Sequence, residues 1–200
     1  MPGEAPGGVD LPRVVLVRHG QTEWSRTHRH TSITDLPLEP EGEEEARRLA
    51  PVLAGTSWTR VLASPLRRAL ETCRLAGLGD RAETCSDLVE WRYGDYEGLT
   101  TPEIQGQRPG WRLWTDGAPG GEAPAEVAAR VDRVIASIRR ETGTVAVFAH
   151  GHILRVLAAR WVGLGPEGGA YLALGAGRLS RLGWEHQEPV VELWNSSRLG

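Results

Sequence analysis

The stretch that decides the fold is VVLVRHGQTEW, Val14–Trp24, in which four apolar residues lead directly into Arg18, His19 and Gly20. A continuous apolar run is typical of a strand covered on both faces, so we predict a strand over Arg13–Val17. Charged groups lose hydration when they are buried, so an arginine and a histidine at the tip of such a strand indicate a functional role that offsets this cost. We therefore take both as candidate functional residues.

Further segments alternate between strand and helix patterns. Short apolar runs predict strands at Arg60–Ala63 and Thr144–Ala149, and alternation with period two predicts closing strands in AYLALG, RLSRLGWEH and EPVVELW. Helical spacing and start signals predict helices over Leu38–Leu53, Ser64–Leu75 with Ser64 as N-cap, Glu122–Thr142 and His152–Val162. Strands that alternate with helices predict an α/β fold, a three-layer α/β/α sandwich with a mostly parallel central sheet.

The length of 200 residues fits a single domain, which we place at residues 13–195. Residues 1–12 are expected to be a disordered leader, because they lack the basic and apolar regions of a signal peptide, and 196–200 a tail. A segment rich in Gly, Pro and Trp at residues 98–121 predicts a lid-like excursion over one end of the sheet. Trp111 and Trp114 are either a substrate platform or the core of this lid, and Glu122 is expected to be an acid at a helix start.

Composition excludes several classes of function. The chain carries 23 basic and 26 acidic residues, a net charge of −3, which argues against a nucleic-acid surface. No apolar run is long enough to cross a membrane. Cys73 and Cys85 lie in no disulfide framework or metal motif, so we expect packing residues and a cytoplasmic location. All the basic residues are arginines, so an anion site here must use guanidinium groups, whose geometry suits phosphate.

Chemically active residues follow several of the predicted strands. Arg18-His19-Gly20 follows the first predicted strand, and His150-Gly151-His152 follows the strand at Thr144–Ala149 in the same way. Arg67 and Arg68 follow the second predicted strand, and Glu90 precedes the excursion. Because sites in parallel sheets form beyond the carboxyl ends of the strands, these residues are expected to meet at one edge. Arginines, histidines, helix N-termini and a carboxylate together suit a phosphoryl group and its protons.

The motifs VRHGQTEW, SPLRRALETC, LVEWRYGDYEG and AHGHILR resemble those of the histidine phosphatase superfamily, which has the phosphoglycerate-mutase-like fold, over about residues 13–195. The resemblance implies that His19 is the nucleophile that becomes phosphohistidine and that Glu90 is the acid/base. It implies a phosphate clamp of Arg18, Arg68 and His150. The spacing from Ser64 selects Arg68 rather than its neighbour, which is expected on the surface.

Specificity is expected in the loop after the first motif. Family members commonly have Asn where Ser25 stands, and the loop resembles a subgroup that includes sugar phosphatases of the sedoheptulose-bisphosphatase kind. The predicted substrate-binding residues are Gln21, Ser25, Thr31, Ser32 and Gly151. His28, Arg29 and His30 either bind a second anionic group or are solvated loop residues.

The function expected from these residues is that of a phosphomonoesterase acting on a small, sugar-type phosphate ester, with no metal and no cofactor. One alternative is a phosphoglycerate mutase, but the chain between Gly98 and His150 is shorter than the water-excluding insertions of such mutases. The other is a non-catalytic phosphate-binding module, which would not need a proton donor such as Glu90. The oligomeric state is left open.

Overall fold

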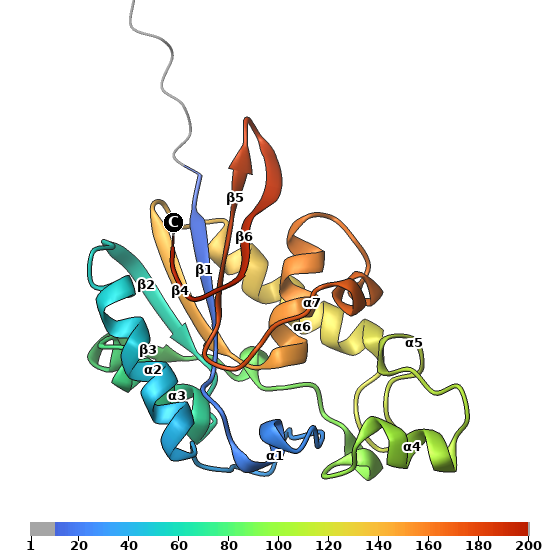
Figure 1. The fold of residues 1–200 in the computed structure, drawn as a ribbon. Helices are drawn as coiled ribbons and strands as arrows, with labels where there is room; N and C mark the ends of the chain where they lie inside the picture. The colour runs from blue at the N-terminus through green and yellow to red at the C-terminus, as the bar shows by residue number, and fades with distance from the viewer. Residues whose placement is uncertain (1–10, 200) are drawn as a thin grey trace, which may run out of the picture.

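The strand that carries the opening motif, β1, lies inside a single six-stranded sheet (Figure 1). The computed structural model describes residues 11–199, and the sheet order is β3-β2-β4-β1-β5-β6. The strands are β1 Arg13–Arg18, β2 Trp58–Ala63, β3 Ala82–Thr84, β4 Thr144–Ala149, β5 Leu179–Glu185 and β6 Glu188–Ser196. β1, β2, β3 and β4 run parallel, whereas β5 pairs antiparallel with β1 and with β6. The predicted sandwich with a mostly parallel sheet is confirmed.

The register of the sheet brings the two His-Gly steps together. β1 pairs with β4 from Arg13 opposite Thr144 to Arg18 opposite Ala149. His19 and His150 therefore leave adjacent parallel strands at the same level, and their ring centroids are 5.1 Å apart. The candidate site thus lies at the carboxyl edge of the sheet, where parallel strands generally place their sites.

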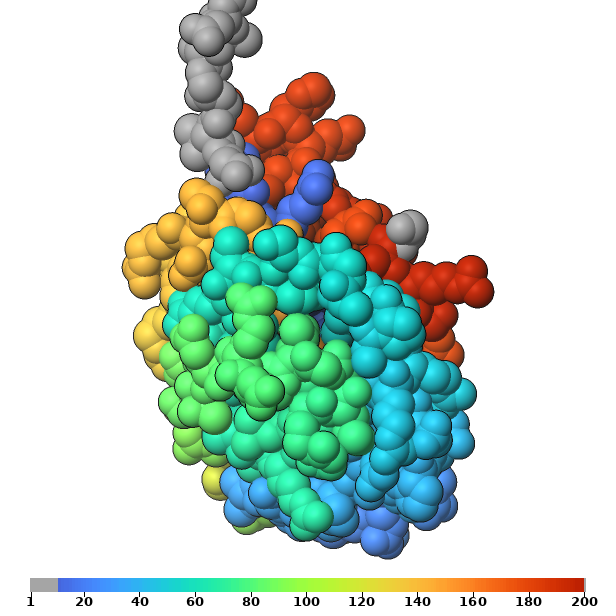
Figure 2. Space-filling model, turned by 90° about the vertical axis from the view of Figure 1, so that its left-hand side faces the viewer, coloured from blue at the N-terminus to red at the C-terminus, as the bar shows by residue number. Residues whose placement is uncertain are grey.

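Helices cover both faces of the sheet, because alternate side chains of the strands point to opposite sides. Val15 and Val17 pack under α2 and α3, and Leu16 packs under α6 and α7. The space-filling view shows the cyan and green residues of α2, α3 and the segment that follows them filling one face (Figure 2). The helices are α1 Glu23–Arg26, α2 Pro40–Leu53, α3 Arg67–Leu75, α4 Thr101–Gln107, α5 Leu113–Asp116, α6 Pro124–Ile138 and α7 Gly151–Trp161. Within residues 11–199, none of them is long and apolar enough to cross a membrane.

The segment AYLALG, residues 170–175, is not the predicted strand. Its start belongs to a 3₁₀ helix, Pro166–Tyr171, and the rest is loop. Its carbonyl groups are bound by side chains rather than by a neighbouring strand: Arg155 donates to the Ala170 carbonyl, Trp194 to that of Ala173 and Arg18 to that of Leu174. The alternation of apolar residues in this segment therefore belongs to a loop and not to a strand.

Two predicted helix starts are also corrected. α3 begins at Arg67, and Ser64 does not cap it, because the Ser64 hydroxyl lies 2.7 Å from His150 Nε2. α6 begins at Pro124, so Glu122 precedes the helix instead of opening it. In both cases a polar residue near a helix start is used in a long-range contact that local capping rules do not foresee.

The ends of the chain differ slightly from the predicted boundaries. Residues 1–10 of the predicted leader, and residue 200, lie outside the described residues. Pro12 is buried and its carbonyl accepts a hydrogen bond from Trp184 Nε1 at 2.8 Å, so the ordered fold starts before residue 13. β6 extends to Ser196, one residue into the predicted tail.

The excursion at residues 98–121 carries α4 and α5 and extends away from the sheet (Figure 1). Trp111 is 2% exposed and its Nε1 donates to the Gly117 carbonyl, so this ring is part of the core of the excursion. Trp114 is only partly buried and stacks edge-on against Trp91 and His152. Neither ring lines the pocket described below.

Candidate active site

His19 is held at the tip of β1 by the main chain on both sides. Its N–H donates to the Ala149 carbonyl of β4, and its carbonyl accepts from the N–H of Gly177, just before β5. The next residue must be glycine, because a Cβ at Gly20 would lie 2.1 Å from the Gly42 carbonyl oxygen of α2. The position of the imidazole is therefore fixed by β1, by the main-chain hydrogen bonds to Ala149 and Gly177, and by the close contact of Gly20 with α2.

The hydrogen bonds of His19 define its tautomer. Nδ1 lies 2.7 Å from the Gly20 carbonyl oxygen, which can only accept, so Nδ1 carries the proton and Nε2 keeps its lone pair. Burial, reinforced by the positive charges of Arg68 and Arg18, holds the pKa of His19 well below its ordinary value. The ring is thus neutral at physiological pH, with Nε2 available as a nucleophile.

Arg68 and His150 form a buried pair behind His19. Arg68 is completely buried, and its Nε donates to His150 Nδ1 at 3.1 Å. An arginine only donates, so His150 Nδ1 is the acceptor and Nε2 carries the proton that points to Ser64 Oγ. Burial and the charge of Arg68 hold the pKa of His150 well below its ordinary value, in agreement with a neutral ring. Neither residue of the pair lines the pocket itself.

Arg18 extends from the end of β1 into the pocket. Its Nη1 donates to the Leu174 carbonyl, and its Nε is buried without a hydrogen-bond partner among residues 11–199. A Cβ at Gly151 would lie 3.3 Å from the guanidinium carbon, so glycine at this position leaves room for the arginine. A buried donor without a partner is uncommon and is expected where a ligand supplies the acceptor.

Glu90 lies at the N-terminus of α7, although it is distant in sequence. Its Oε1 accepts from the N–H groups of Trp91 and Ile153 at 2.9 Å, and Oε2 accepts from the N–H of His152 at 3.0 Å. The residue is 5% exposed, and its side chain faces the pocket. Helix N-termini stabilise carboxylates, so α7 holds Glu90 in place beside the pocket.

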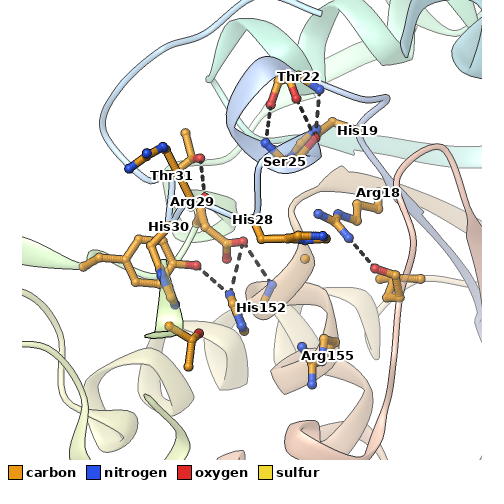
Figure 3. Close-up of a pocket in the computed structure, with 15 residues that line it drawn as sticks. Arg18, His19, Thr22, Ser25, His28, Arg29, His30, Thr31, His152 and Arg155 are labelled. Carbon is orange, nitrogen blue, oxygen red and sulfur yellow. Dashed lines mark hydrogen bonds and ion pairs between the residues drawn. The ribbon is translucent and has the colours of Figure 1, made fainter. Parts of the chain in front are cut away.

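The pocket at this sheet edge has a volume of about 200 Å³ (Figure 3). In the close-up, Arg29, His30 and Thr31 lie on one side and Arg18 and Arg155 on the other. The walls of the pocket are mostly polar and cationic, as expected for a pocket that binds an anion. The lining residues are Arg18, His19, Thr22, Ser25, His28, Arg29, His30, Thr31, Glu90, Tyr93, Thr101, Gly151, His152, Arg155 and Leu174.

Only three of the five predicted substrate-binding residues line the pocket. Thr31 and Gly151 line the pocket, and so does Ser25, but the Ser25 hydroxyl donates to the Thr22 carbonyl in the capping box of α1. Gln21 and Ser32 do not line it. Gln21 donates from Nε2 to Glu39, and Ser32 donates to Glu97.

Six residues of the pocket wall had no predicted role: Thr22, Tyr93, Thr101, His152, Arg155 and Leu174. His152 Nδ1 lies 2.6 Å from the Tyr93 hydroxyl, and burial raises the pKa of that hydroxyl well above its ordinary value. Arg155 donates from Nε to the Gly169 carbonyl and lies over the Trp114 ring, 4.4 Å from its centroid. The only signal was spacing, because Arg155 follows Gly151 by one helical turn and so shares its face.

Arg67 is exposed, as predicted, while Arg68 points inward.

Among residues 11–199, no group of three or more His, Cys, Asp or Glu side chains is placed to hold a metal ion.

A buried ion pair supports the segment that carries Glu90. Arg130 on α6 donates from Nε and Nη2 to the two carboxylate oxygens of Glu122, at 2.8 and 3.0 Å. The same guanidinium donates to the carbonyl groups of Asp87, Val89 and Glu90. The exposed fractions of the Arg130 and Glu122 side chains are 5% and 9%, so the pair is largely excluded from water.

Replacing Glu122 by glutamine is expected to destabilise the fold by about 3 kcal/mol, because it leaves the charge of Arg130 buried without its counter-ion. The free energy of unfolding in urea measures this. Glu126→Gln, at an exposed residue in the first turn of α6, is the control and should cost less than about 1 kcal/mol. Equal losses for the two variants would contradict the role of the pair.

The chain is similar to known proteins over nearly its whole length. The family model "Histidine phosphatase superfamily (branch 1)" matches residues 14–197. An acid phosphatase of Mycobacterium tuberculosis is 38% identical over 183 residues, 90% of each chain. Sedoheptulose 1,7-bisphosphatase of Saccharomyces cerevisiae is 39% identical over 189 residues, covering 78% of this chain and 69% of the yeast protein. A solved structure of a mycobacterial glucosyl-3-phosphoglycerate phosphatase with VO3 superposes with a TM-score of 0.78 at 30% identity, covering 92% of this chain and 98% of the other.

Proposed function

Because the chain belongs to branch 1 of the histidine phosphatase superfamily and is a phosphatase, we propose that it hydrolyses small phosphate monoesters through a phosphohistidine formed on His19. The observation that carries this proposal is the tautomer of His19. Its Nδ1 proton is held by the Gly20 carbonyl and its pKa is lowered, so Nε2 offers a free lone pair beside a polar, cationic pocket.

The reaction proceeds in two transfers. His19 Nε2 attacks phosphorus, the bond from phosphorus to the ester oxygen breaks, and Glu90 as a carboxylic acid protonates the departing alkoxide. Water then attacks the phosphohistidine and gives its proton to the Glu90 carboxylate, the N–P bond breaks and phosphate leaves. Each cycle therefore restores neutral His19 and protonated Glu90.

Positive charge stabilises the transferring phosphoryl group, because phosphoryl transfer depends mainly on positioning and electrostatics. Arg18 supplies it from the pocket wall, where its buried Nε has no partner in the part of the chain that the structure describes. Arg68, with His150 behind it, adds positive charge next to His19. No step requires a metal ion or a cofactor.

The proposed substrate is a sugar-type phosphate. Arg29 and Arg155 line the pocket in addition to Arg18, together with hydroxyl and imidazole groups that suit a polyol or a second anionic group. Two of the relatives are a sedoheptulose bisphosphatase and a glucosyl-3-phosphoglycerate phosphatase, both of which carry sugar substrates in their names.

A substrate panel tests the proposal. Release of inorganic phosphate is measured with sugar phosphates, phosphoglycerates, nucleotides and phosphopeptides in the presence of EDTA. We expect turnover to survive chelation and to be fastest, by about tenfold or more in kcat/KM, with a sugar phosphate. Isomerised phosphoglycerate without free phosphate would indicate a mutase instead, and tight phosphate binding without turnover would indicate a binding module.

A further inference from the structure

Glu97 is a carboxylate with an unusual set of partners. Its two oxygens accept hydrogen bonds from the N–H and hydroxyl of Ser32 and from the N–H of Thr34. No arginine or histidine within residues 11–199 forms an ion pair with it. A half-buried carboxylate is thus held entirely by one short loop, residues 31–34.

The other side of this loop faces Arg68. The carbonyl groups of Thr31, Ser32 and Thr34 accept from the two Nη atoms of the guanidinium, at 3.1 to 3.2 Å. The Thr31 carbonyl and the Ser32 N–H belong to the same peptide group. One peptide unit therefore lies between carboxylate and guanidinium, with its N–H toward the negative charge and its C=O toward the positive charge.

This orientation couples the two charges. A peptide dipole aligned between an anion and a cation strengthens both hydrogen bonds, because each polarises the group for the other. The pKa of Arg68 is lowered by burial, and the negative charge of Glu97 is among those that oppose this effect. The coupling continues through Arg68 Nε to His150, whose proton position depends on that contact.

We propose that Glu97 is a positioning residue for phosphoryl transfer, acting through the Thr31–Ser32 peptide to fix the guanidinium of Arg68; this rests on the proposed phosphatase function. Glu97 does not line the pocket. Glu97 holds the loop of residues 31–34 in place, and the carbonyl groups of this loop hold the guanidinium of Arg68. The contribution of Glu97 to catalysis is greatest when charge develops on the phosphoryl group.

The substitution Glu97→Gln tests this, because glutamine keeps the size but removes the charge and one acceptor. With p-nitrophenyl phosphate we expect kcat to fall about tenfold while KM changes by less than about twofold, the pattern for an interaction that matters mainly in the transition state. Inhibition by orthovanadate should weaken by about the same factor. Asp95→Asn is the matched control: Asp95 is an exposed carboxylate two residues away, and its variant should stay within about twofold of wild type.

A double-mutant cycle with Arg68→Lys separates positioning from general loss of structure. If Glu97 acts through Arg68, Glu97→Gln should lower kcat by less than about twofold in the lysine background, since the planar guanidinium is already gone. A full tenfold loss in that background, or wild-type kcat and vanadate inhibition for Glu97→Gln alone, would overturn the proposal. Should Glu97→Gln not fold, Ser32→Ala removes one of the same hydrogen bonds and enters the same cycle.

Different results would contradict the proposed phosphatase function and the proposed role of Glu97. A wild-type protein that releases no phosphate from any ester removes the proposed function itself. A wild-type protein that turns over normally while the cycle is additive removes only the role of Glu97.

Discussion

Replacing His19 by alanine is expected to lower kcat by at least about 10⁴-fold, because it removes the nitrogen that accepts the phosphoryl group and leaves only binding and electrostatics. The measurement is phosphate release from the best substrate of the panel. Within residues 11–199 the His19 side chain makes a single hydrogen bond, to the Gly20 carbonyl, so the variant should keep its fold by circular dichroism.

The covalent intermediate gives this prediction a second readout. After brief incubation with ³²P-labelled substrate and an alkaline quench, which preserves phosphohistidine, label should remain on the wild-type protein and be absent from His19→Ala. His30→Ala is the comparison, because His30 is a second buried imidazole in the same pocket, with its Nδ1 bound to the Leu99 carbonyl. Label lost from both variants, or retained by His19→Ala, would place the nucleophile elsewhere.

Replacing Glu90 by glutamine should slow the hydrolysis of alkyl phosphates by about 10³-fold, within the range for loss of a general acid. A sugar alkoxide is a poor leaving group and needs the proton that Glu90 supplies. p-Nitrophenolate leaves without protonation, so the loss with p-nitrophenyl phosphate should be far smaller. The ratio of the two kcat/KM values, wild type against variant, is the quantity to measure.

The ratio also controls for a structural effect of the same variant. Both Glu90 oxygens accept backbone N–H groups, so the amide nitrogen of glutamine must face one of these donors and disturb the start of α7. Such a disturbance would slow both substrates alike. Equal losses on both esters would therefore be explained by this disturbance alone and would contradict the role of Glu90 as the proton donor.

The layout of the fold could be predicted because it depends on local patterns. The apolar run before Arg18 and the run over Thr144–Ala149 are the buried strands β1 and β4, and the latter has the predicted bounds. The His-Gly steps that follow them meet at one sheet edge because parallel strands end together. Predicting the location of the candidate site required only these two facts.

What could not be predicted depends on contacts between residues far apart in sequence. Ser64 has the chemistry of a helix cap, but its hydroxyl faces His150, 86 positions away. Glu122 has the position of a helix-start acid, but it pairs with a buried arginine. Arg68 was singled out by the motif SPLRRALETC, and Glu97 lies in the motif LVEWRYGDYEG. Neither motif indicates that the loop of residues 31–34 connects the two side chains.

The antiparallel pairing of β1 with β5 has a consequence for how the protein reaches its active form. Val14 to Val17 pair with Leu182 to Leu179, and the His19 carbonyl accepts from Gly177. The strand that carries the nucleophile is thus completed by a segment about 160 residues later, and such distant contacts form slowly because a long loop must close first. During synthesis, a ribosome-bound chain whose β5 is still in the exit tunnel would expose one edge of β1, and catalytic competence would arrive only after β5 has docked against β1.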